Sequence, residues 1–248
     1  MIKKIVKKLL YKAGYKIKKI PKSYPPKKRI VEKFSMEAAL QRAVARNIEV
    51  ATVIDVGASD GRWSENCMKA YPNANYLLVE AQKGHLEGLK ACAAKYDKVS
   101  YVLAAAGAAK GTIYFDDTEL FGGVASATKL KENYIEVPVI AIDDQIKEEG
   151  LPGPYMLKLD THGFEVPILQ GAQEVLKQCS LVIIETYNFK LGDQALRYWE
   201  MCAHMDALGF WPLENVDLML RELDEAFWQM DTLFIPKTHP ILSKRGYR

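Results

Sequence analysis

The first 29 residues of the chain contain no acidic side chain. They hold twelve Lys or Arg residues, and this segment is called the basic arm below. The whole chain of 248 residues has a net charge of +3, so the remainder carries −9 once the twelve charges of the arm are taken away. The sequence therefore predicts a basic arm and linker over residues 1–34 and an acidic domain over residues 35–248.

The sequence also lacks long apolar runs, and none approaches the ~20 residues that span a bilayer. Its start has neither an uninterrupted apolar core nor a small-residue cleavage site, which argues against a secretory signal. None of the four cysteines forms a C-x-x-C pair. With a hydrophobic fraction of 49%, these absences predict a soluble cytoplasmic protein with reduced, packed thiols.

In the basic arm, apolar residues from Ile2 to Ile20 recur at spacings of three and four, with lysines between them. This pattern predicts an amphipathic helix, which Pro25 and Pro26 would end. We expect such a helix to lie on the anionic inner face of a membrane. Packing on its own domain or on a sister chain, as in a homo-oligomer, is the alternative. Nucleic acid is disfavoured because stacking aromatic residues are sparse.

Beyond the arm, short apolar runs alternate with helical patterns. Such runs are typical of a parallel sheet that helices cover on both faces. Residues 111–117 and 135–144 are expected to be extended excursions. Two final strands, 211–217 and 232–237, without a full helix between them predict an antiparallel pair. The expected strands are 52–56, 75–80, 99–104, 155–160 and 181–186, and the expected helices lie near 61–71, 82–95, 164–178 and 193–208.

The stretch "VIDVGASDGRWS" joins the first strand to the first helix. Gly57 makes the turn and Gly61 opens the helix, where a doubly wound sheet binds its ligand. The spacing G-x-x-x-G lacks the second glycine of the dinucleotide fingerprint, and Asp55 and Asp60 would repel a pyrophosphate. The loop therefore favours S-adenosylmethionine over NAD, and Glu80, at the end of the second strand, suits the ribose hydroxyls. An ordinary strand–turn–helix is the alternative.

The stretch "KLDTHGFEVPILQGA" (158–172) places two acids and a histidine where a strand gives way to a helix. In an extended chain Asp160 and His162 face the same side. We expect His162 to act as a general base and Asp160 to orient it. Asp160 as the base, or His162 as a hydrogen-bonding residue without proton transfer, are the alternatives. Glu165 is expected to favour the positive end of the following helix or to bind the acceptor.

The same three side chains could also form a metal set. Their spacing, Asp-x-His-x-x-Glu, is a weak metal signature without a second histidine nearby, so no metal is predicted. The other histidines, His85, His204 and His239, are expected to be surface or packing residues.

These motifs, in this order, resemble the FkbM family of S-adenosylmethionine-dependent methyltransferases. The resemblance runs from about Thr52 to Pro236, and its most specific part is K-[IL]-D-x-x-G-x-E followed by "LQGA". It implies an α/β class I (Rossmann-like) methyltransferase fold. Such a fold has a seven-stranded, mostly parallel sheet with an antiparallel last strand and helices on both faces.

The resemblance also implies site residues. Ser59, Asp60 and His162 differ from the residues that many members carry at those positions. Asp160 is expected to lie beside both the cofactor and the acceptor. The expected cofactor residues are Asp55, Gly57, Ala58, Ser59, Gly61, Glu80, Ala81, Ala104, Ala105 and Asp160, and the expected acceptor residues are Glu165, Glu185, Tyr187 and Asn188.

The sequence therefore predicts an S-adenosylmethionine-dependent O-methyltransferase that acts on a sugar hydroxyl in a glycan or glycolipid precursor. A secondary metabolite is the other acceptor class that the resemblance implies. An NAD-dependent oxidoreductase on the same kind of sheet and a non-catalytic membrane-associated binding protein are the alternative functions. Residues 117–129 are expected to be a mobile lid over the acceptor or an ordinary surface loop.

Overall fold

The computed structural model describes residues 32–120, 122–126, 128–129, 134–192, 194–244 and 246. The basic arm lies outside the described residues, and so does its predicted helix. Glu32–Arg248 forms one compact unit. Within the described part of the chain, no helix is both long and apolar enough to cross a membrane.

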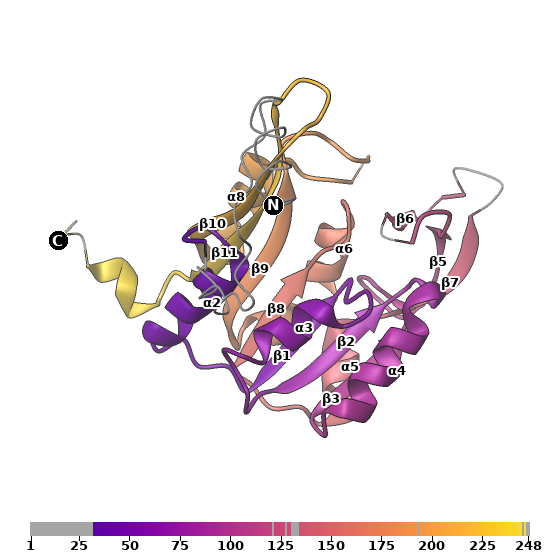
Figure 1. The fold of residues 1–248 in the computed structure, drawn as a ribbon, viewed down its shortest axis with the longest axis horizontal. Helices are drawn as coiled ribbons and strands as arrows, with labels where there is room; N and C mark the ends of the chain where they lie inside the picture. The colour runs from indigo at the N-terminus through magenta and orange to yellow at the C-terminus, as the bar shows by residue number, and fades with distance from the viewer. Residues whose placement is uncertain are drawn as a thin grey trace, which may run out of the picture. The chain divides into compact units, whose positions relative to one another are not determined.

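The central sheet has seven strands in the order β10-β11-β9-β8-β1-β2-β3 (Figure 1). Strands β1, β2, β3, β8 and β9 pair in parallel, whereas β11 runs antiparallel to both β9 and β10. The predicted fold class is confirmed. The strands are β1 (Thr52–Val56), β2 (Asn75–Glu80), β3 (Val99–Leu103), β8 (Tyr155–Leu159), β9 (Cys179–Tyr187), β10 (Phe210–Leu220) and β11 (Phe227–Pro236).

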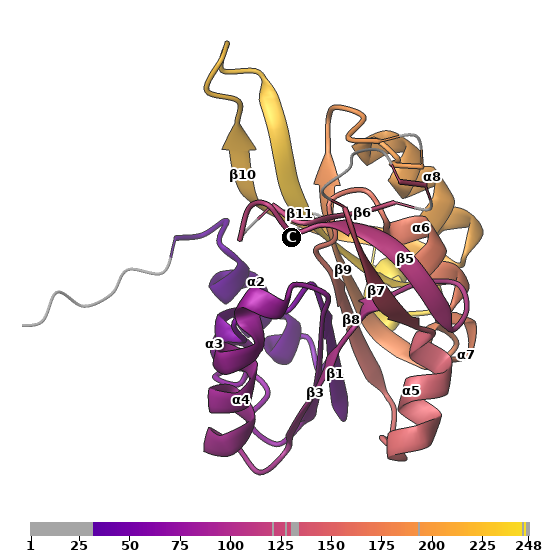
Figure 2. The ribbon, with the colours of Figure 1, turned by 90° about the vertical axis from the view of Figure 1, so that its right-hand side faces the viewer.

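Helices cover both faces of this sheet (Figure 2). Successive side chains of β1 point to opposite faces, so Val53 and Ile54 belong to two different core clusters. Burying such side chains contributes about 1.5–3 kcal/mol each. One face carries α2 (Met36–Ala45), α3 (Arg62–Cys67) and α4 (Leu86–Lys95), and the other carries α5 (Ile142–Glu149), α6 (Glu165–Gln170), α7 (Gln173–Leu176) and α8 (Tyr198–Ala207).

Short 3-10 helices precede α4 and follow β11, at Lys83–His85 and Pro240–Ser243. Ser35 caps the first helix of the domain, since its hydroxyl accepts a hydrogen bond from the Ala38 N–H. That bond satisfies one of the backbone donors that a helix start leaves unpaired.

The two segments expected as extended excursions supply two strands of a second sheet. Its four strands lie in the order β4-β7-β5-β6. The end of the second segment is helical rather than extended, because Ile142 and Ile146 of α5 are buried one turn apart. Two apolar residues make a stripe too short to predict from the sequence. The strands are β4 (Ala105–Ala106), β5 (Gly111–Asp116), β6 (Val124–Ser126) and β7 (Ile135–Ile140).

Candidate active site

The turn between β1 and α3 packs directly on the end of β8. Gly57 has φ 75° and Gly61 has φ 87°, in the left-handed region that favours glycine. A Cβ atom on Gly57 would lie 1.9 Å from the backbone oxygen of Asp160. The Asp160 N–H also donates a hydrogen bond to the Val56 oxygen, at 3.0 Å. The two motifs singled out in the sequence therefore meet in space.

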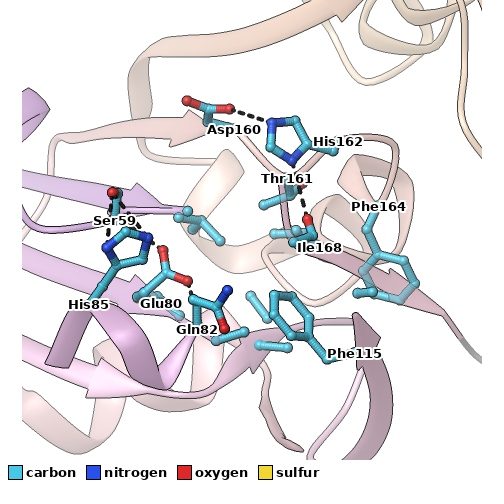
Figure 3. Close-up of a pocket in the computed structure, with 18 of the residues that line it drawn as sticks. Ser59, Glu80, Gln82, His85, Phe115, Asp160, Thr161, His162, Phe164 and Ile168 are labelled. Carbon is cyan, nitrogen blue, oxygen red and sulfur yellow. Dashed lines mark hydrogen bonds and ion pairs between the residues drawn. The ribbon is translucent and has the colours of Figure 1, made fainter. Parts of the chain in front are cut away.

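A pocket of about 410 Å³ opens at this junction (Figure 3). It lies at the carboxyl ends of the parallel strands, where doubly wound sheets bind ligands. Asp55, Ala58 and Gly61 do not line it, and Asp55 and Ala58 are buried in the protein. The expected site residues that do line it are Gly57, Ser59, Glu80, Ala81, Ala104, Ala105, Asp160, His162 and Glu185.

Glu80 is a buried acid fixed by backbone donors. Its two carboxylate oxygens accept hydrogen bonds from the N–H groups of Ser59 and Gln82, both at 2.7 Å. Each carboxylate oxygen has a second lone pair, so Glu80 can still accept hydrogen bonds from a ligand.

His85 has a role that the sequence did not indicate. It is buried at 5% exposure, as a packing residue would be, but it also lines the pocket. Its Nε2 atom lies 2.7 Å from the Leu120 oxygen, and since a carbonyl only accepts, Nε2 carries the hydrogen. The Gln82 side-chain amide donates to the Glu119 oxygen at 3.0 Å. These bonds hold the start of the predicted lid against the rim of the pocket.

Lys158, in β8, is a buried cation between two acids. Its Nζ atom lies 3.1 Å from Asp55 Oδ1 and 3.2 Å from Asp160 Oδ2, and it donates to the Gly57 oxygen at 3.3 Å. Burial by itself lowers the pKa of Lys158, but the two carboxylates outweigh it and raise that pKa above its usual value. Lys158 therefore stays charged and ties the glycine loop to Asp160.

Asp160 is held in its ionised form. Burial opposes its ionisation, but the neighbouring Lys158 and His162 outweigh burial and keep the pKa of Asp160 below its usual value. A carboxylate in this form can orient an imidazole or bind a cation.

His162 faces Asp160 across the wall of the pocket (Figure 3). Its Nδ1 atom lies 3.2 Å from the Gly123 oxygen, so Nδ1 carries a hydrogen and donates it. Its Nε2 atom lies 3.7 Å from Asp160 Oδ1 and 3.7 Å from Glu185 Oε2. The structure thus brings the predicted pair together, but at 3.7 Å the two side chains are not hydrogen-bonded.

Glu185 completes this wall from β9. Its carboxyl group accepts hydrogen bonds from the Tyr187 hydroxyl and the Gln229 side-chain amide. Burial and the charge of Asp160 raise the pKa of Glu185 to about 9. The same two causes raise the pKa of Asp231, the cross-strand partner of Glu185, to about 7. This end of the pocket therefore holds more acid groups than Lys158 can balance.

The other three expected acceptor residues do not line the pocket. Glu165 Oε1 accepts hydrogen bonds from the Gly163 N–H at 2.9 Å and the Thr161 hydroxyl at 3.1 Å, so it closes the turn at the start of α6. Tyr187 contacts Glu185 instead, and the Asn188 N–H donates to the Trp228 oxygen. Their contact with an acceptor stays a prediction.

Several lining residues were not among the expected site residues. Some lie in the predicted lid (117–129) or inside the motif 158–172, where other members were singled out, and the rest lie after β2, in β5 or in β11, where no motif pointed to a site. Besides Gln82 and His85, they include Phe115, Leu120, Gly123, Ala125, Thr161, Phe164, Ile168 and Gln229.

The family model of the methyltransferase FkbM domain matches residues 55–231. The chain belongs to the FkbM methyltransferase family. Its cofactor is accordingly S-adenosylmethionine, as the sequence predicted. The matched range contains both the glycine loop and the strand end that carries Asp160 and His162.

Solved methyltransferases are similar to this FkbM-family chain. Methyltransferase FkbM from Methylobacillus flagellatus KT is 15% identical with a TM-score of 0.49, covering 73% of this chain and 43% of that one. This chain thus spans less than half of that protein. O-methyltransferase TomG from Streptomyces achromogenes, solved with SAM, is 12% identical, with a TM-score of 0.46 and coverage of 81% and 79%. A comparison with curated proteins gave no match.

The pocket fits the cofactor of the family in four respects. Gly57 leaves the loop without a side chain, so a ligand can approach its backbone. Glu80 offers acceptors for ribose hydroxyls, and the small side chains of Ala104 and Ala105 leave room for a flat ring. The volume of about 410 Å³ also lies in the range of small-molecule sites, roughly 300–1,000 Å³.

Gly57→Ala is expected to lower the free energy of unfolding by about 2–5 kcal/mol, because it combines left-handed strain with a backbone clash. Urea unfolding of the cofactor-free protein measures it. The matched control is Gly150→Ala, since Gly150 has φ 64° but nothing within 4 Å of the position that a Cβ atom would take there. Equal losses in the two variants would contradict the close approach of Gly57 to Asp160.

Proposed function

We propose that the protein transfers a methyl group from S-adenosylmethionine to a hydroxyl group of a sugar, in a glycan or glycolipid precursor. One observation carries this proposal: His162, Asp160 and Glu185 line the same pocket as the glycine loop and Glu80. Groups that can handle the proton of an acceptor therefore adjoin the residues that would hold the methyl donor.

The bound cofactor supplies a methyl group that is already activated on a sulfonium. The protein must then hold the acceptor oxygen in line and remove its proton. His162 donates from Nδ1 to Gly123, which leaves Nε2 to receive that proton. Asp160 and Glu185 lie beside Nε2, and the ionised Asp160 would stabilise the positive charge that develops there. Lys158 fixes Asp160 in this arrangement.

The lining of the pocket supports a sugar as the acceptor. Glu185, Gln229 and Thr161 offer donors and acceptors for hydroxyl groups. Phe115 and Phe164 offer apolar surface for the C–H faces of a sugar ring. A few polar groups set in an apolar wall are typical of sites that orient a small molecule.

The basic arm supports an acceptor at a membrane, because twelve cations without an acid attract anionic lipid headgroups. Sedimentation with vesicles that contain phosphatidylserine tests this part, using the chain with and without residues 1–29. Equal sedimentation of both forms, or of neither, would remove the arm from the proposal and leave the chemistry untouched.

Calorimetry with S-adenosylhomocysteine and NAD tests the cofactor. S-adenosylhomocysteine is expected to bind and NAD is not. Glu80→Gln should lower the affinity for S-adenosylhomocysteine by about tenfold or more, because hydrogen bonds to a charged group contribute about 1.5–3 kcal/mol. Glu87→Gln, on the exposed side of α4, is the control and should leave affinity unchanged. Binding of NAD instead would favour the oxidoreductase.

Mass spectrometry tests the acceptor. Glycans and lipids from cells with the protein should carry a methyl group that is missing from cells without it. A methylated product that contains no sugar would keep the methyltransferase and overturn the acceptor class.

A further inference from the structure

Three side-chain atoms converge on one wall of the pocket. Asp160, His162 and Glu185 each offer one ligand atom, and these atoms lie within 4.8 Å of one another. His162 Nε2 lies 3.7 Å from both carboxylates, beyond the range of hydrogen bonds. Metal–ligand distances of about 2.0–2.6 Å place two ligands of one ion at most about 5 Å apart. The space between the three ligand atoms is therefore large enough to hold one divalent cation.

Each of the three side chains is held from outside the set. His162 donates its Nδ1–H to the backbone oxygen of Gly123, the bond that a metal-ligating histidine usually makes with its other nitrogen. Lys158 contacts Asp160 through Oδ2, which leaves Oδ1 toward His162. Gln229 donates to Glu185 Oε1, and the Tyr187 hydroxyl donates to Oε2, whose second lone pair stays available on the side of His162. These outer contacts fix the orientation of the three converging atoms.

We propose that Asp160, His162 and Glu185 form a binding site for a divalent cation. One imidazole nitrogen and two carboxylate oxygens suit Mn²⁺ or Zn²⁺. Glu185 would release its proton to solvent as the ion binds, so that two negative charges balance the ion. Three protein ligands leave coordination positions open to the pocket. The sequence expectation of no metal considered Glu165, which the structure turns toward Thr161 and Gly163. Glu185, from the neighbouring strand, takes that place.

The cation site deepens the proposed function and rests on it. A hydroxyl that binds a divalent ion has a lowered pKa, so the acceptor would release its proton to solvent and its oxygen would stay on the ion. His162 then serves as a ligand, and the ion replaces Nε2 in activating the acceptor. The reaction is methyl transfer whether His162 or the ion activates the acceptor.

Titration of the metal-free full chain with Mn²⁺, followed by electron paramagnetic resonance, tests the site. We expect saturable binding of one Mn²⁺ per chain. Asp160→Asn and Glu185→Gln should each weaken it by more than tenfold. The matched control is Asp231→Asn, which removes a neighbouring carboxyl on β11 that is not one of the three and should change affinity less than twofold. Thermal unfolding of each variant shows that it is folded.

Each result decides one question. Absence of saturable Mn²⁺ binding, or an equal loss in Asp231→Asn, overturns the cation site. S-adenosylhomocysteine binding by the same metal-free protein is measured in parallel. If it binds while Mn²⁺ does not, the cation site fails and the proposed function stands. If Mn²⁺ binds and S-adenosylhomocysteine does not, the proposed function fails instead.

Discussion

Lys158→Met is expected to lower the free energy of unfolding by about 3–5 kcal/mol, because it leaves a buried acid without its cation. Asp55 is 0% exposed, and its Oδ1 atom has Lys158 Nζ at 3.1 Å as its counter-charge. Methionine keeps the apolar stem of the side chain and removes only the ammonium group. Urea unfolding followed by circular dichroism measures the loss.

The double variant Asp55→Asn/Lys158→Met separates charge from packing. Removing both members of the Asp55–Lys158 pair together often costs little, so the double variant should regain the part of the stability lost at Asp55, while Asp160 still lacks its cation. Lys95→Met breaks an exposed pair with Glu65 and is the surface control, with no measurable change expected. A Lys158→Met protein that unfolds at the urea concentration of the unchanged chain would contradict the buried pair as a source of stability.

Local patterns in the sequence were enough to predict the central sheet. The mostly apolar runs 52–56 and 155–159 are buried along their whole length, and a sheet covered by helices on both sides accommodates them. Glycine at 57 and an acid at 80 marked the loop and the strand end that line the pocket. These features depend on residues close in sequence, so they can be predicted from the sequence alone.

Contacts between strands that are far apart in the sequence could not be predicted from local patterns. The Lys158–Asp55 pair depends on the register of β8 against β1, and the position of Glu185 beside His162 depends on the neighbouring strand β9. Spacing within "KLDTHGFEVPILQGA" offered Glu165 as a possible third metal ligand, but that side chain bonds within its own turn. Proximity in sequence could not show that Glu185, on the neighbouring strand, lies beside His162.

His162→Ala is expected to lower the turnover of methyl transfer by about 10²–10⁴-fold, the usual contribution of a general base. The loss is expected because the imidazole is the group that lies between Asp160 and Glu185 at the wall of the pocket. Affinity for S-adenosylhomocysteine should stay within about threefold, since Glu80 and the glycine loop are unchanged. Single-turnover transfer of labelled methyl to the acceptor found by mass spectrometry measures the first effect, and calorimetry measures the second.

The backbone at His162 calls for a second variant. Its φ of 53° is left-handed, a conformation that asparagine tolerates better than most residues. His162→Asn therefore removes the imidazole with less strain, and an equal loss of turnover in both variants assigns the effect to the ring. His204→Asn, in α8, is the control and should turn over normally. If His162→Asn keeps full turnover, the imidazole neither takes the proton nor holds an ion, and Asp160 becomes the remaining candidate for the base.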